Sequence, residues 1–114
     1  MILNMNRRFV SAISVFLISV LCILFLWKQT ILLSVLLLLI AYIKHKICPI
    51  KRELLWFVLV FLGGAIVEIL LVNFGNAWSY STPQLFNIPI WMPVFWGVIG
   101  TTIIVIYDEL TGNK

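Results

Sequence analysis

Residues 54–72 read LLWFVLVFLGGAIVEILLV, a run of apolar side chains interrupted by a single acid, Glu68. A helix that crosses a membrane needs about 20 predominantly apolar residues, so this stretch has the length and the composition of one span. The rest of the chain agrees, because 63% of its 114 residues are hydrophobic and only 11% are charged. A soluble domain is about half apolar and a quarter charged. We therefore interpret the chain as an integral membrane protein, in preference to an unusually apolar soluble helical domain.

Three further apolar runs flank this one, and together they predict an all-α, polytopic membrane protein built as a four-transmembrane-helix bundle. We expect a single transmembrane domain over residues 1–114, with an aromatic outer loop between the third and fourth helices and with helices at about 9–27, 31–43, 54–72 and 90–107. No small-residue cleavage site follows the first run, so we interpret it as a helix and not as a signal peptide. The second run is short, and Gln29 and Lys44 are expected to snorkel at its ends. In the fourth run, Pro93 is expected to kink or restart the helix.

The basic side chains are distributed unequally between the two ends of such a bundle. With four spans, both termini and the loop 44–53 lie on one side of the membrane, and the other side holds only Lys28. The first side holds seven of the eight basic residues, namely Arg7, Arg8, Lys44, Lys46, Lys51, Arg52 and Lys114. The positive-inside rule therefore predicts a multi-pass protein of the cell membrane with both termini cytoplasmic.

Residues that commonly hold metals or cofactors are few. The one histidine, His45, lies among lysines and is expected to be solvated. Cys22 and Cys48 lie in different surroundings, without metal-ligand spacing to the histidine, so we expect free thiols with no reactive role. No glycine motif that would hold a phosphate is present. We therefore expect no cofactor, no metal and no nucleic acid partner, and the bilayer accounts for the basic charge.

Glu68 is the residue that most needs an explanation. It lies four residues before the outer end of its apolar run, which is roughly 6 Å below the membrane boundary at 1.5 Å per residue. A carboxylate in hydrocarbon is costly, so it should face the bundle and find a partner. Gly64 and Ala65 lie on the same helical face one turn earlier and leave room beside it. Small residues at helical spacing, here and at Gly97 and Gly100, also predict close contacts between helices.

The outer loop, residues 73–89, and its flanks supply the candidate partners of this acid. Trp and Tyr gather at membrane interfaces in any case, but here they are denser than an interfacial belt requires. As candidate catalytic residues we name Glu68, acting as acid or base, and Tyr80, as a second proton-transfer group. The candidate binding residues are Asn73, Asn76, Trp78, Trp91 and Trp96.

The last third of the chain carries a recognisable pattern. Glu68 is followed by Gly75-Asn76-Ala77-Trp78-Ser79-Tyr80 and by Pro89-Ile90-Trp91-Met92-Pro93. This arrangement of an acid, Gly-x-x-Trp-x-Tyr and Pro-x-Trp-x-Pro resembles that of small uncharacterised prokaryotic integral membrane proteins. More distantly it resembles the membrane-embedded lycopene cyclases and related carotenoid-pathway proteins, which implies acid-initiated chemistry on an isoprenoid with Glu68 as the proton donor. The paired acids that follow the proline in those cyclases are replaced here by Ile90 and Trp91.

Three functions remain open at this point. The first is a small helical-bundle protein with a structural, accessory or lipid-binding role and a buried polar site at Glu68. The second is a membrane enzyme that acts on a lipophilic, isoprenoid-like substrate. The third is a small multidrug-type transporter, which is disfavoured because its membrane glutamate belongs near the midplane of the first helix. The expected partners are the lipid bilayer, a lipophilic small molecule for the second function, and further subunits in a homo- or hetero-oligomer.

Overall fold

The structure is a computed structural model, and it describes residues 7–76, 78–80, 83 and 86–112. Four α-helices make up nearly all of this part of the chain, in which no β-strand occurs. They are α1 (Arg7–Leu26), α2 (Thr30–Ile47), α3 (Glu53–Asn73) and α4 (Trp91–Thr111). Each is long and apolar enough to cross a membrane. The predicted fold class, a multi-pass four-helix bundle, is therefore confirmed.

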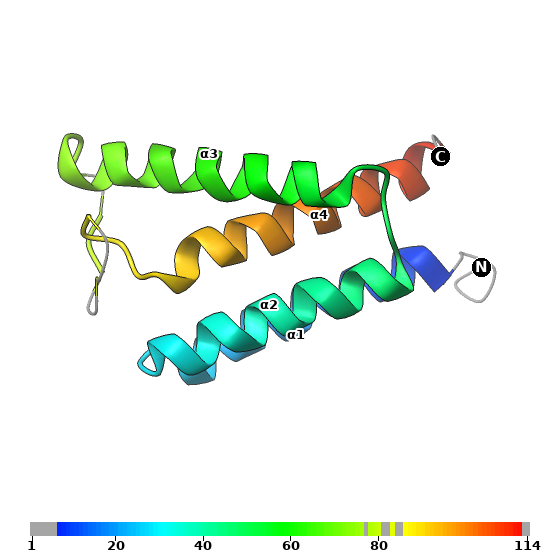
Figure 1. The fold of residues 1–114 in the computed structure, drawn as a ribbon, viewed down its shortest axis with the longest axis horizontal. Helices are drawn as coiled ribbons and strands as arrows, with labels where there is room; N and C mark the ends of the chain where they lie inside the picture. The colour runs from blue at the N-terminus through cyan, green and yellow to red at the C-terminus, as the bar shows by residue number, and fades with distance from the viewer. Residues whose placement is uncertain (1–6, 77, 81–82, 84–85, 113–114) are drawn as a thin grey trace.

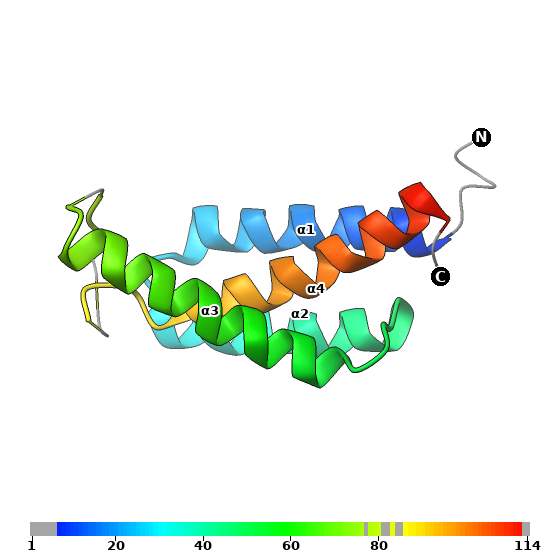
Figure 2. The same cartoon turned by 90° about the horizontal axis from the view of Figure 1, so that it is seen from above.

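The helices form three layers with α4 in the middle (Figures 1 and 2). α1 and α2 pair as an antiparallel hairpin on one side of α4, and α3 crosses its other side. α4 packs against all three other helices, whereas α3 packs chiefly against α4. Within the most apolar 18-residue stretch of each helix, 39% of the residues are buried in α4, against 17% in each of the other three helices. α4 is thus the core of the bundle.

Proline and local backbone geometry mark the ends of the helices. α2 continues to Ile47, beyond the predicted end at residue 43, and the backbone N–H of Cys48 closes its last turn on the carbonyl of Lys44 at 2.8 Å. Pro49 then disfavours helical geometry for the residue before it. α3 begins one residue after Arg52, whose φ of 56° is left-handed. At the start of α4, Pro93 lies in the first turn, where a backbone N–H has no partner within the helix, so it neither kinks nor restarts the helix.

Glycines allow α3 and α4 to approach closely. A Cβ added at Gly64 would overlap the indole of Trp96, and one added at Gly97 would lie 2.6–2.8 Å from three ring carbons of Phe57. Because each glycine faces an aromatic ring of the opposite helix, the two helices interlock in both directions. These contacts agree with the role predicted for the small residues.

The two ends of the bundle differ in charge. The start of α1, the α2–α3 connection and the end of α4 lie together at one end, which we call the basic end (Figure 1). The α1–α2 turn and the α3–α4 loop lie at the other, which we call the loop end. Among the described residues, Lys28 is the only basic residue at the loop end.

Candidate functional site

Glu68 lies on α3 near the loop end and is 4% exposed. Its Oε1 accepts a hydrogen bond from the hydroxyl of Tyr80 in the α3–α4 loop. Its Oε2 accepts a hydrogen bond from the indole Nε1 of Trp96 in α4, at 2.5 Å. One carboxyl group therefore joins three parts of the chain that are 12 and 28 residues apart in sequence.

The aromatic side chains of the loop extend this network toward the surface. Trp78 donates its indole N–H to the hydroxyl oxygen of Tyr80 at 3.1 Å. An indole N–H is only a donor, so the tyrosine keeps its own proton for Glu68. Burial, and then the hydrogen bond to Glu68, raise the pKa of Tyr80 well above its usual value. The phenol therefore remains protonated, and remains a donor, throughout the physiological range.

A second set of hydrogen bonds closes the loop at its base. The side-chain amide of Asn73 donates to the carbonyl of Ile69 at 2.9 Å and to the carbonyl of Phe86 at 2.8 Å. Its oxygen accepts a hydrogen bond from the amide of Asn87 at 2.5 Å. Phe86 and Asn87 both have positive φ, of 47° and 70°, a conformation that asparagine tolerates better than most residues. Asn73 thus fixes the return of the chain toward α4.

A pocket of about 360 Å³ lies at the surface of this loop. Its described lining contains no charged side chain, and it combines aromatic rings with amide and hydroxyl groups. The lining residues are Val72, Asn76, Trp78, Ser79, Tyr80, Pro83 and Asn87. Tyr80 therefore connects the lining of the pocket to Glu68, which is itself shielded.

The residues named from the sequence take three different positions in this arrangement. Asn76, Trp78 and Tyr80 line the pocket, while Asn73 and Trp96 hold the loop and α4 in place. Trp91 lies elsewhere: it is 5% exposed and belongs to an apolar core cluster with residues of α1 and α2. Its indole nitrogen has no hydrogen-bond partner among the described residues.

Comparison with known proteins gives no family for this arrangement. No protein-family model matches the chain, and neither a curated protein nor a solved structure matches it significantly. The site therefore has to be interpreted from its own geometry.

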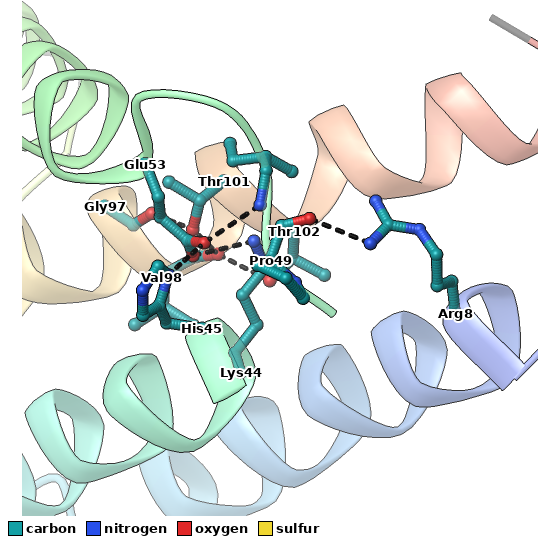
Figure 3. Close-up of polar contacts among 10 residues, drawn as sticks. Arg8, Lys44, His45, Pro49, Glu53, Gly97, Val98, Thr101 and Thr102 are labelled. Atoms are coloured by element: carbon teal, nitrogen blue, oxygen red, sulfur yellow. Dashed lines mark hydrogen bonds and ion pairs between the residues drawn. The ribbon is translucent and has the colours of Figure 1, made fainter. Parts of the chain in front are cut away.

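A second polar cluster, which the sequence did not predict, lies at the basic end (Figure 3). Lys44 is completely buried, and its Nζ is 2.7 Å from Oε2 of Glu53 at the start of α3. The other carboxylate oxygen is 2.9 Å from Nδ1 of His45 and accepts the backbone N–H of Ile50 at 3.2 Å. Lys44 therefore does not snorkel to the surface. His45 is exposed to solvent, as expected, but its ring also contacts Glu53. The sequence signal for this cluster was Glu53, the only acid in the basic segment.

The connection between α2 and α3 is held by further contacts. Arg8 of α1 forms an ion pair with Glu109 at the end of α4, at 3.0 Å. It also donates to the carbonyl of Pro49 at 2.8 Å (Figure 3). Cys48 is fully buried, and burial raises the pKa of its thiol. A buried, protonated thiol is a poor nucleophile. The described residues bring no three His, Cys, Asp or Glu side chains together in a way that could hold a metal ion.

Two threonines of α4 do not join the cluster at the basic end. Thr101 and Thr102 are fully buried, and their hydroxyls donate to carbonyls of their own helix, at 2.9 Å to Gly97 and 2.6 Å to Val98 (Figure 3). Since the hydroxyl protons are used there, they cannot be donated to Glu53. Lys44, His45 and the loop backbone are left as the partners of that carboxylate.

Proposed function

We propose that the protein is a small integral membrane accessory protein without catalytic activity, whose α3–α4 loop binds the polar part of a lipophilic molecule. The observation that carries this proposal is the full engagement of Glu68. Each of its oxygens accepts a hydrogen bond, one from the loop and one from α4. A carboxylate used in this way acts as an anchor, because a proton-transfer group needs an oxygen within reach of the substrate.

The pocket chemistry supports an uncharged polar group as ligand. Its described lining offers amides of Asn76 and Asn87 and the rings of Trp78 and Tyr80, but no charge. An anion bound there would lose hydration without gaining a cation. Apolar surface is also exposed at this end of the bundle, since Phe74, the residue that follows α3, is 80% exposed. A ligand with an uncharged head and an apolar tail would fit both surfaces.

The second candidate function is an enzyme on a lipophilic substrate, and one contact favours it. Tyr80 lines the pocket and its hydroxyl is hydrogen-bonded to Glu68, so a proton could pass between Glu68 and a bound substrate through this tyrosine. The resemblance to isoprenoid-pathway membrane proteins points in the same direction. This function is placed second because no acid is among the described residues that line the pocket.

We further propose that the protein resides in the cell membrane with both termini cytoplasmic. The argument is the charge asymmetry, with seven of eight basic residues on the side of the termini and the α2–α3 connection. The loop pocket would then face away from the cytoplasm.

Protease protection of the α3–α4 loop tests the proposed function. The full-length protein in liposomes is digested briefly, with and without added dioleoylglycerol, a lipid with an uncharged head. In Glu68→Gln the amide oxygen can accept from Trp96 while the amide nitrogen donates to the oxygen of Tyr80, so cleavage should stay within about twofold of the parent. Glu68→Leu loses both hydrogen bonds, at a cost on the order of 1 kcal/mol, and should be cleaved about fivefold faster.

The digestions with added lipid show whether the loop binds a ligand, in addition to being anchored by Glu68. Dioleoylglycerol should slow cleavage of the parent and of Glu68→Gln, whereas dioleoyl-phosphatidylglycerol, with the same chains and an anionic head, should not. Equal cleavage of Glu68→Leu and the parent would contradict the anchoring role. Equal protection by the two lipids would contradict the choice of an uncharged ligand.

A further inference from the structure

A second pocket, of about 490 Å³, lies at the basic end beside the α2–α3 connection. It forms where α3 stands away from α1, so that part of α4 is left uncovered between them. Its walls come from α1, the connection, α3 and α4. The lining residues are Arg8, Pro49, Ile50, Lys51, Trp56, Ile104 and Asp108. The pocket thus combines two cations, one carboxylate, an indole and apolar side chains.

The charges in this pocket are not all balanced by the protein. The chain has four acids, and three of them are engaged: Glu53 with Lys44, Glu68 with its aromatic donors, and Glu109 with Arg8. The carboxylate of Asp108, the fourth, forms no hydrogen bond or ion pair among the described residues, although the residue is only partly exposed.

The cations of the pocket also keep donors free. Lys51 likewise has no partner among the residues that the structure describes. Arg8 uses its Nε and one Nη1 proton for Glu109 and Pro49. A guanidinium has five N–H donors, so three remain available. The pocket therefore presents cationic donors and an unpaired carboxylate at the same time.

We propose that this pocket binds the headgroup of a phospholipid that carries both a phosphate and a primary ammonium, as phosphatidylethanolamine does. Arg8 and Lys51 bind the phosphate oxygens through charge-assisted hydrogen bonds. Asp108 accepts hydrogen bonds from the ammonium. A purely anionic headgroup would leave Asp108 unpaired beside a like charge, and a quaternary ammonium has no N–H to donate to it.

The position of the pocket identifies a membrane lipid as the source of this group. Trp56 and Ile104 lie on helices that are long and apolar enough to span a membrane. Trp56 is 44% exposed, and tryptophan is the residue typical of the membrane interface. Large apolar side chains of the same helices, such as Leu59 and Ile103, are more than half exposed. Acyl chains below a bound headgroup would cover this apolar surface. The site is at the opposite end from the α3–α4 loop and does not depend on the function proposed for that loop.

Lipid-dependent thermal stability of the purified full-length protein tests the proposal. The protein in a mild detergent is titrated with dioleoyl lipids that bear ethanolamine, choline or glycerol headgroups, and the rise in melting temperature gives an apparent affinity for each. The parent should bind the ethanolamine lipid about tenfold more tightly than the other two, the effect expected for one charge-assisted hydrogen bond.

Near-isosteric variants identify the residues responsible. Asp108→Asn should lose the preference for ethanolamine over choline, because its amide cannot balance the ammonium. Lys51→Gln should weaken binding of all three lipids. Lys46→Gln removes the same charge at the same end but outside the pocket, and it should change nothing. A preference for the anionic glycerol lipid in the parent would overturn the proposal, since general attraction to the basic end predicts that order. Retention of the ethanolamine preference in Asp108→Asn, or equal losses in the two lysine variants, would also overturn it.

Discussion

At the scale of single residues, the ion pair of Lys44 and Glu53 is the most consequential contact that the apolar pattern does not reveal. Both side chains are at most 9% exposed, and their charged atoms are 2.7 Å apart. Taking two charges out of water is costly, and the attraction between them offsets that cost only while both are present. The pair therefore joins the end of α2 to the start of α3, and it stabilises this junction only while both charged side chains are present.

Removal of one member of this pair should destabilise the bundle strongly. Lys44→Met leaves Glu53 buried with only His45 and a backbone N–H, and we expect a loss of about 3 kcal/mol in the free energy of unfolding. Denaturation in detergent measures it. Lys46→Met, two residues away and exposed, is the matched control and should cost little.

The double variant Lys44→Met/Glu53→Gln tests whether the loss comes from the unpaired charge. It should be more stable than Lys44→Met alone, because no buried charge is left without a partner. If the double variant instead loses as much stability as Lys44→Met and Glu53→Gln do together, the lysine contributes through packing and not through the ion pair.

At the scale of helices, the contact between α3 and α4 depends on which glycine faces the partner. Gly64 abuts the indole of Trp96, whereas the neighbouring Gly63 has nothing within 4 Å of an added Cβ. Gly64→Leu should therefore push α4 away and also displace the indole that donates to Glu68.

Gly63→Leu is the control, because it makes the same glycine-to-leucine substitution at the neighbouring position. We expect Gly64→Leu to lower the melting temperature and Gly63→Leu to leave it unchanged or slightly higher, since leucine has the better helix propensity. If both variants melt alike, the close contact between α3 and α4 at this position is not important for stability.

The comparison of sequence with structure is clearest at this scale. Long apolar runs determine the existence of the helices, because a backbone in lipid must satisfy its own hydrogen bonds, and all four helices follow from them. The direction in which a side chain points does not follow. Trp91 and Trp96 are five residues apart, about 140° around a helix, so only one of them can face Glu68. Which one does so depends on how α4 packs between α3 and the α1–α2 hairpin.

The buried cluster at the basic end was missed for a related reason. A lysine at the end of an apolar run is ordinarily explained by snorkelling. The sequence around Lys44 would look the same whether this side chain snorkels or is buried in an ion pair. Only the fold brings the carboxylate of Glu53, nine residues later, to within 2.7 Å of its ammonium.

At the scale of the whole molecule, the charge asymmetry gives a prediction about orientation. Cys48 is unsuitable as a reporter because it is fully buried. Single cysteines introduced as Lys28→Cys and Lys51→Cys, in a background with Cys22→Ser and Cys48→Ala, place reporters at exposed positions of the two ends. A membrane-impermeant maleimide should label residue 28 in intact cells and residue 51 only after lysis. The reverse pattern would contradict the proposed orientation.

The central position of α4 has a consequence for biogenesis. A chain is synthesised from its N-terminus, yet the helix that contacts all the others is made after them, and α3 packs chiefly against it. Until α4 leaves the insertion machinery, α3 lacks the helix against which it chiefly packs. During that interval Glu68 lacks the indole of Trp96, which belongs to α4, so one of its two hydrogen bonds cannot form while α3 is in the bilayer. Assembly of this bundle is therefore necessarily late and concerted: arrival of α4 completes the core and satisfies the acid in the same step.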